Sequence, residues 1–129
     1  MYSGDVMIKG VGVDIVKISR IDKAIGRTNN FLKGVFTENE ISYFQMKNNN
    51  IETIAGYFAA KEALSKALGT GIRGFRLTEI EIIKDNLGKP SIRISKSMEK
   101  KFNVTNNKIF LSISHSSDNA IAYVVIEEE

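Results

Sequence analysis

The stretch FAAKEALSKALGTG, residues 58 to 71, constrains the fold of this chain more than any other segment. Its alanines and leucines recur with the spacing of a helix, and Gly69 provides a carboxyl-terminal stop. We expect this helix to begin near Glu52, and its small side chains allow close packing against a neighbouring element. Three charged residues interrupt the apolar run, namely Lys61, Glu62 and Lys66. They form either a solvated edge or a chemical site.

The composition is that of one ordinary globular domain. With 129 residues, 43% hydrophobic and 26% charged, a single domain over residues 1–129 is expected. Cysteine is absent, which excludes disulfides, thiolate metal sites and a cysteine nucleophile. The N-terminus has no apolar run long enough for a signal peptide or a membrane span. We therefore expect a cytoplasmic protein.

The charge is unevenly distributed. The net charge is +3, which favours anionic partners without choosing between nucleic acid, nucleotide and acidic protein. Between residues 17 and 33 a basic cluster contains a single acidic residue, Asp22. The cluster is either a solvated helix face or a docking surface for an acidic partner. Its members are Lys17, Arg20, Lys23, Arg27 and Lys33.

Residues 7–16, MIKGVGVDIV, alternate as a strand does. One face carries Val11, Val13 and Ile15, and the other carries Gly10, Gly12 and Asp14. Two glycines beside a carboxylate either leave room for something to approach the backbone or only permit a twist.

The remaining pattern predicts an α+β fold, with a long helix packed on an antiparallel sheet. A short helix is expected over 17–27, and Thr37 followed by Glu40 has the form of a capping box before a helix over 38–47. The last half alternates as strands. We expect a hairpin of strands 78–84 and 91–95 around the turn DNLGKP (85–90), a short helix over 96–103, and a hairpin of strands 108–114 and 119–127.

Asp14 and Glu62 are the candidate chemical groups. Both have small neighbours, and a partly buried carboxylate without a partner is costly. Mg²⁺ would satisfy both, because it takes one or two carboxylates together with waters and substrate phosphates. Lys66 follows Glu62 by four residues, the favourable order for a helical ion pair. Lys66 is therefore either part of a surface pair or a group that binds phosphates recruited by the metal.

Several common sites are missing from the sequence. There is no Walker sequence and no GxGxxG fingerprint, and GTG (69–71) is at the wrong end of its helix for a dipole-driven phosphate site. His115 is the only histidine, which excludes a multi-histidine metal site. Its loop, SHSSD, is polar enough to hold a phosphate.

Four segments in this order and spacing resemble the holo-acyl-carrier-protein synthases, the small group of the 4′-phosphopantetheinyl transferases. They are GVGVDI (10–15), FAAKEALSKALGTG (58–71), DNLGKP (85–90) and SISHSSDNAIAYVVIE (112–127). The resemblance covers nearly the whole chain. It implies transfer of 4′-phosphopantetheine from coenzyme A to a serine of apo acyl carrier protein, with release of adenosine 3′,5′-bisphosphate, in fatty acid biosynthesis.

The resemblance also implies roles for single residues. Asp14 and Glu62 match the Mg²⁺ ligands, and Lys66 matches the lysine that faces the same phosphates. The serine proton would go to Glu62, directly or through a bound water. Arg20 and Arg27 match a surface that meets the acidic carrier protein. Positions matching coenzyme A contacts are Lys61, Lys66, Gly69, Asn86, Gly88, Lys89, Pro90, Ser114, His115 and Ser116.

The resemblance also implies a homotrimer, because members of this family are trimeric with each active site at a subunit boundary. The resemblance leaves open whether Asp14 and Glu62 come from different subunits or lie on either side of one interface. Tyr57 stands where the family often has Arg, so a phosphate contact is lost or replaced. Residues 1–6 precede the family's usual start near Met7 and are either a natural extension or an added segment.

Two other functions are weighed against this one. A small basic nucleic-acid-binding domain would use the cluster at 17–33, but no RNP-like strand, KH loop or zinc-finger spacing occurs, and Asp14 and Glu62 stay unexplained. A degenerate relative that binds coenzyme A without turnover is disfavoured by the intact set Asp14, Glu62 and Lys66. We expect neither nucleic acid nor membrane as a partner.

Overall fold

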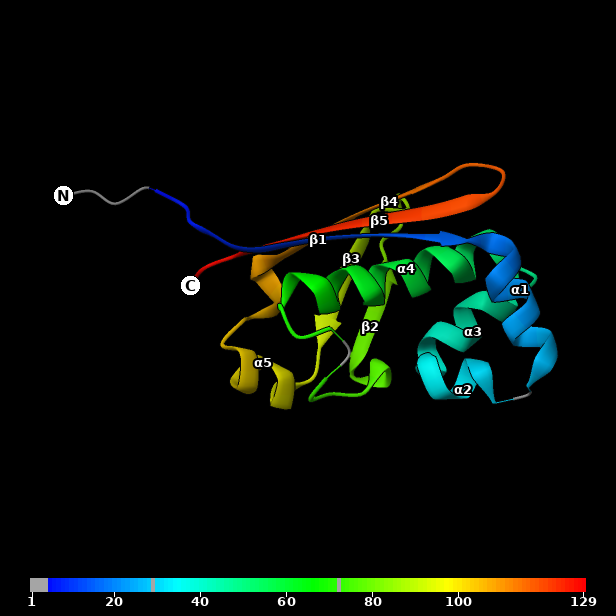
Figure 1. The fold of residues 1–129 in the computed structure, drawn as a ribbon, viewed down its shortest axis with the longest axis horizontal. Helices are drawn as coiled ribbons and strands as arrows, with labels where there is room; N and C mark the ends of the chain where they lie inside the picture. Colours follow the sequence, from blue (N-terminus) through cyan, green and yellow to red (C-terminus); the bar gives the residue numbers. More distant parts are fainter. Residues whose placement is uncertain (1–4, 29, 72) are drawn as a thin grey trace.

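The computed structural model describes residues 5–28, 30–71 and 73–129. A three-stranded antiparallel sheet lies over a long central helix, α4, and further elements lie on the helix's other sides (Figure 1). The strand order is β1-β5-β4, so the last strand of the chain lies between the other two. These strands are β1 (Ile8–Lys17), β4 (Ile109–His115) and β5 (Asn119–Glu127).

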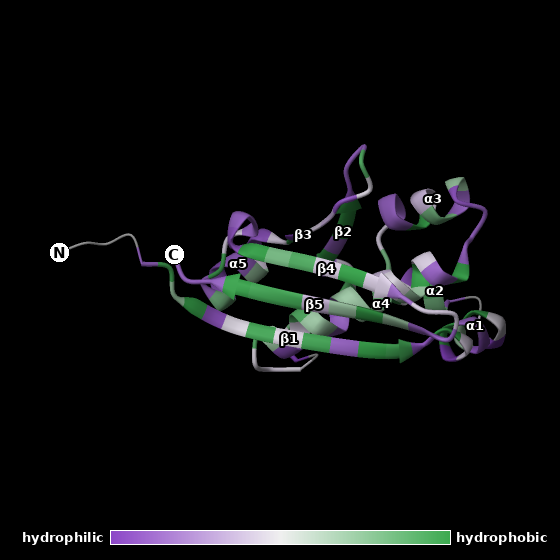
Figure 2. Ribbon diagram, turned by 90° about the horizontal axis from the view of Figure 1, so that it is seen from above, coloured by the Kyte–Doolittle hydropathy of each residue, from purple (hydrophilic) through white to green (hydrophobic). Residues whose placement is uncertain are grey.

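A second, two-stranded sheet is the antiparallel hairpin β2 (Ile80–Lys84) and β3 (Pro90–Ile94). Asp85 shapes the turn between them, because its carboxylate accepts hydrogen bonds from the backbone N–H groups of Leu87 and Lys89. Both predicted hairpins are therefore confirmed. Seen from above, the hairpin reaches out beyond β4, whereas β1 forms the opposite edge of the large sheet (Figure 2).

Among the described residues, five helices complete the fold. Thr37 and Glu40 form the predicted capping box at the start of α3. The predicted stop of α4 is also confirmed, because Gly69 follows the helix with a φ of +82°, a value that favours glycine. The sequence pattern does not predict α2. The helices are α1 (Ile18–Arg27), α2 (Phe31–Val35), α3 (Glu38–Met46), α4 (Ile51–Ala67) and α5 (Lys96–Phe102).

Two short 3₁₀ turns, η1 (Leu77–Glu79) and η2 (Asn106–Lys108), lead into β2 and β4. Within the described ranges, no helix has the length and apolar character that crossing a bilayer requires. Residues 1–4 of the expected N-terminal extension lie outside the described part of the chain.

Helix α4 is what approaches the two glycines of β1. A Cβ at Gly12 would collide with the backbone oxygen of Ala63 and lie 2.7 Å from the backbone nitrogen of Ala67. A Cβ at Gly10 would likewise collide with the backbone oxygen of Ala67. The alternation in β1 therefore follows burial, since its glycine face contacts α4 and its valine face points away. This close approach sets the geometry of the site.

Candidate active site

The contact between β1 and α4 brings together Asp14, Glu62 and Lys66. Asp14 lies on the inner face of β1, two residues after Gly12, where the strand is closest to the helix. The Lys66 ammonium donates hydrogen bonds to the Asp14 Oδ1 atom and to the backbone oxygen of Val13, both at 3.1 Å. Lys66 therefore pairs with Asp14 across two elements, and not with Glu62 in the helical surface pair that is one of the two alternatives the sequence leaves open.

Burial and the charges around Glu62 shift the pKa of its carboxyl group. Its pKa is raised above the ordinary value, first by burial and then by the negative charge of Asp14. Lys66 and Arg20 act in the opposite direction. Lys66, which bonds Asp14, follows Glu62 by one turn of α4, so both carboxylates belong to the β1–α4 contact of a single chain.

Two neighbouring carboxylates are suited to a hard divalent cation. Among the described residues, no group of three or more His, Cys, Asp or Glu side chains could hold a metal. The set is therefore open, with Asp14 and Glu62 as the available protein oxygens. Such a set fits Mg²⁺, because this ion usually keeps waters and takes its remaining ligands from substrate phosphates.

His115 lies away from this cluster. Its Nε2 atom is 2.9 Å from the backbone oxygen of Glu52 in the first turn of α4, and its ring packs on Gly56. His115 belongs to β4 and Asp14 to β1, with β5 between them. Ser114, which the structure places in β4, and Ser116, just after the strand, are exposed on either side of His115.

The turn at 85–90 is also on the β4 side of the molecule (Figure 2). Asn86, Gly88 and Lys89 are exposed there. The residues predicted to bind coenzyme A therefore lie in two places within one chain. Lys66 and Gly69 are on the β1 side, at the end of α4, and the turn and the His115 loop are at the opposite edge of the sheet.

The comparisons with known proteins agree with this arrangement. The family model described as "4'-phosphopantetheinyl transferase superfamily" matches residues 10–124. The chain belongs to this superfamily. A holo-[acyl-carrier-protein] synthase of Clostridium botulinum (strain Alaska E43 / Type E3) is 56% identical over 94% of this chain and 98% of its own length. One of Clostridium tetani is 53% identical over 95% and 98%.

Solved structures of synthases have the same fold. That of Helicobacter pylori in complex with coenzyme A matches with a TM-score of 0.81 and 39% identity, over 90% of this chain and 98% of the other. That of Neisseria meningitidis matches with 0.85 and 34%, over 95% and 100%. The predicted family, enzyme class and α+β fold are thereby confirmed.

One predicted contact of this phosphopantetheinyl transferase is wrong. The sequence indicates that Lys61 is a secondary coenzyme A contact at best or faces solvent, but its side chain is fully buried. It forms an ion pair with Glu40 at 2.6 Å, and backbone oxygens accept its other hydrogen bonds. The reason is tertiary: α3 and β2 cover the side of α4 that carries Lys61.

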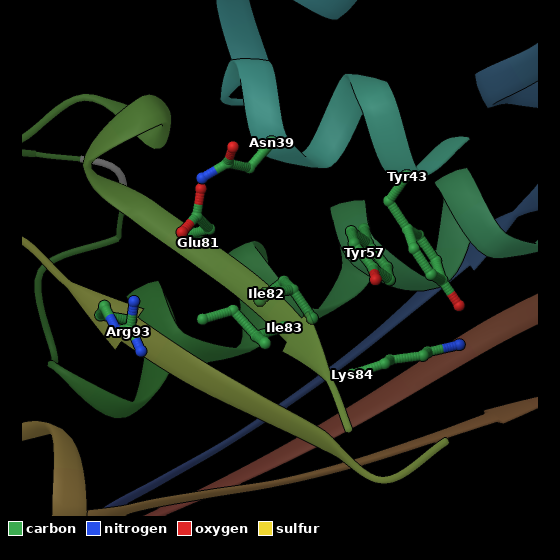
Figure 3. Close-up of a pocket in the computed structure, with 8 residues that line it drawn as sticks. All are labelled: Asn39, Tyr43, Tyr57, Glu81, Ile82, Ile83, Lys84 and Arg93. Atoms are coloured by element: carbon green, nitrogen blue, oxygen red, sulfur yellow. The ribbon is translucent and has the colours of Figure 1, made fainter. Parts of the chain in front are cut away.

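The transferase has a pocket that the sequence did not indicate (Figure 3). It measures about 330 Å³ and lies between α3 and the hairpin. Tyr57 contributes to its wall and stacks on Tyr43, with ring centres 5.7 Å apart. Lys84 lies 5.7 Å from the Tyr57 ring centre, and its pKa is lowered by burial and by Lys47. The lining residues are Asn39, Tyr43, Tyr57, Glu81, Ile82, Ile83, Lys84 and Arg93.

Tyr57 therefore serves as a packed aromatic residue at the position where the family often has Arg. Its side chain is buried, and burial strongly raises the pKa of its phenol, so it stays neutral. The Lys84 ammonium lies over its ring, and Lys84 ends β2 immediately before the turn at 85–90. No local pattern marks Lys84, because a lysine at a strand end is usually solvated.

Proposed function

We propose that this enzyme transfers 4′-phosphopantetheine from coenzyme A to a serine of apo acyl carrier protein and releases adenosine 3′,5′-bisphosphate. The observation that carries the proposal is the cluster of Asp14, Glu62 and Lys66 where β1 and α4 meet. The activity is that named for the relatives in Clostridium botulinum and Clostridium tetani. We place the reaction in fatty acid biosynthesis in the cytoplasm.

The chemistry is phosphoryl-group transfer, in which positioning and charge neutralisation do most of the work. The serine hydroxyl attacks the pantetheine-side phosphorus of the pyrophosphate, and the bond from that phosphorus to the oxygen of the leaving adenosine 3′,5′-bisphosphate breaks. Asp14 and Glu62 would hold Mg²⁺, which supplies positive charge to the pyrophosphate when bound. These two carboxylates fit it because the charge of Asp14 acts on Glu62 and because Mg²⁺ usually takes its other ligands from waters and phosphate oxygens.

Lys66 and Glu62 have separate tasks in this scheme. Lys66 is more than half exposed, so its ammonium can leave Asp14 and bind a phosphate when coenzyme A arrives. Glu62 accepts the serine proton, and its raised pKa favours this role because a general base works best near the operating pH.

The nucleotide end of coenzyme A would contact the turn at 85–90 and the loop at 114–116. In one chain these segments lie across the sheet from Asp14, so we propose that a neighbouring subunit completes each site, as in a homotrimer. An exposed apolar face of the sheet supports self-association. It comprises Val11, Val13, Ile15, Phe110, Ile121 and Tyr123.

The carrier protein would bind along α1. Arg20 and Arg27 are exposed on this helix, and Arg20 also acts on the charge of Glu62. A partner that binds Arg20 is therefore held close to the carboxylate that receives the serine proton. Because acyl carrier proteins are acidic, this surface would steer them to the site.

The proposal is tested by mass spectrometry. The protein is incubated with apo acyl carrier protein, coenzyme A and Mg²⁺, and the carrier is expected to gain the mass of one phosphopantetheine. Chelation of the metal with EDTA should stop the reaction, and a carrier whose acceptor serine is changed to alanine is the control. An unmodified carrier under the complete conditions would contradict the proposal.

A further inference from the structure

The interior of the molecule contains an ion pair that the proposed chemistry does not use. The Lys61 ammonium of α4 and the Glu40 carboxylate of α3 are 2.6 Å apart, and neither side chain has exposed surface. The free energy needed to remove two charges from water offsets much of the free energy gained from their attraction. A buried pair is therefore weak evidence for stability. Its geometry indicates a different role.

The Lys61 ammonium donates three hydrogen bonds, one for each of its protons. Besides Glu40, it donates to the backbone oxygen of Val35 at 2.7 Å and to that of Leu77 at 3.1 Å. Val35 ends α2, and Leu77 begins the η1 turn that leads into β2. One side chain of α4 therefore fixes the end of a helix and the entry to the β2–β3 hairpin.

Glu40 fastens the hairpin from the other side. Its Oε2 atom accepts a hydrogen bond from the backbone N–H of Ile82 at 2.7 Å, and its Oε1 atom accepts one from that of Thr37 at 2.9 Å. Ile82 is the central residue of β2, which runs beside α3 (Figure 3). Glu40 thus joins α3, α4 and the middle of β2 through a single carboxylate.

The hairpin does not belong to the three-stranded sheet. Two other side-chain hydrogen bonds hold it: the Thr37 hydroxyl donates to the Glu81 carboxylate at 2.6 Å, and the backbone N–H of Ile94 donates to the Asn106 side-chain oxygen at 2.7 Å. Both are only partly buried, whereas the Glu40–Lys61 pair is fully buried. The segment that connects it to α4 contains Gly69, Gly71 and Gly74, each with a positive φ, and glycine-rich connections restrain their ends weakly. The hairpin's isoleucines pack in the core, but apolar packing is not directional, whereas charge-assisted hydrogen bonds define distance and angle.

We propose that Glu40 and Lys61 are a positioning pair that holds the turn at 85–90 in its place on the frame of α4. The inference rests on the proposed function, in which this turn contacts the nucleotide end of coenzyme A. Asp14, Glu62 and Lys66 are held independently, by the close packing of Gly12 against α4. Loss of the pair should therefore weaken coenzyme A binding and leave the chemical step nearly intact.

The test uses Glu40→Gln, which keeps the shape of the side chain and removes its charge. Coenzyme A binding is measured by calorimetry at 15 °C, where circular dichroism shows whether the variant is folded, and turnover is measured at saturating coenzyme A. We expect the dissociation constant to rise about tenfold and kcat to stay within about twofold. A purely structural pair would lower Tm and leave the affinity of the folded protein unchanged.

Lys9→Met is the matched control. The Lys9 ammonium donates to the backbone oxygens of Phe102 and Asn103 at 2.8 and 2.7 Å, so its loss also removes lysine–carbonyl bonds, away from the hairpin's entry. Its coenzyme A affinity should equal that of the wild type. If Glu40→Gln does not fold, Glu40→Asp, which keeps the charge and shortens its reach, is measured in the same way.

The outcomes separate the two proposals. A folded Glu40 variant with wild-type coenzyme A affinity overturns the positioning role alone. Wild-type protein that binds no coenzyme A overturns the proposed function and this inference with it. An equal loss of affinity in Lys9→Met also overturns the positioning role, because the effect would then follow any loss of lysine–carbonyl bonds.

Discussion

Glu62 illustrates at the scale of one residue how a functional group can destabilise a fold. It lies on a helix of small apolar residues, half-buried and close to Asp14. Burial and the negative charge of Asp14 both raise its pKa above 4.5, its value in an unfolded chain. The folded protein therefore holds the proton of Glu62 more tightly than the unfolded chain does, and the ionised carboxylate lowers the free energy of unfolding.

This gives a prediction for Glu62→Gln. Stability contributed by the protonated group is present below pH 4.5 and is lost as the pH rises through the raised folded-state pKa. At pH 7.5 without metal, the variant should melt about 1–3 °C higher than the wild type, a small gain because water screens a half-exposed group. Scanning calorimetry at pH 4 and pH 7.5 should show the difference only at the higher pH.

The same variant separates stability from function. Added Mg²⁺ should raise the Tm of the wild type and leave that of Glu62→Gln unchanged, because ligands that bind only the folded state stabilise it. Transfer to the carrier protein should be abolished. A variant that transfers normally would show that Glu62 neither holds the metal nor accepts the proton.

At the scale of elements, the contact of β1 with α4 decides where the site forms. Gly12 has no Cβ, and the backbone of Ala63 and Ala67 occupies that position. The strand can therefore come close enough for Lys66 to bond Asp14 across the interface. Three small residues, in two elements about 50 positions apart in sequence, make this contact possible.

Gly12→Ala should destabilise the protein by about 3 kcal/mol, because the new methyl group meets backbone atoms that cannot rotate away. Gly26→Ala is the matched control. Gly26 lies in α1 with nothing within 4 Å of an added Cβ, so alanine there should stabilise the protein by about 0.5–1 kcal/mol. Urea unfolding measures both, and a Gly12→Ala variant as stable as the wild type would contradict the packing described.

At the scale of the whole molecule, the two parts of the proposed site lie on opposite sides of the sheet, and one face of the sheet is uncovered in the described chain. Asp14 and His115 lie on opposite edge strands of the sheet. The outward side of the same sheet exposes valine, isoleucine and aromatic side chains, among them Val13 with 53% of its surface exposed. Self-association would cover this face and bring one chain's β4 edge near another chain's β1 edge.

Val13→Asp should therefore dissociate the assembly, because a charge would be buried in the apolar contact. Sedimentation should give a monomer with a wild-type circular dichroism spectrum, and turnover should fall at least about tenfold because each site loses its second half. The control is Met46→Asp, at a residue of α3 that is 70% exposed. This variant should change neither the oligomeric state nor the turnover. A fully active Val13→Asp monomer would show that one chain suffices.

Much of this protein could be predicted from local sequence. The strand and helix patterns, the capping box of Thr37 and Glu40 and the stop at Gly69 depend on residues within one or two turns of each other. The two faces of β1 follow from its period of two. The four spaced motifs were enough to indicate the family, because their order and spacing along the chain are typical of it.

Only the tertiary structure decided which charges meet. Lys61 and Lys66 belong to the same helix, yet one is buried against Glu40 and the other pairs with Asp14 near the surface. The separation of His115 from Asp14 arises because β5 lies between their strands. The physical reason is that burial and ion pairing depend on which elements pack together. Periodicity along the chain carries no information about the distance in space between two elements.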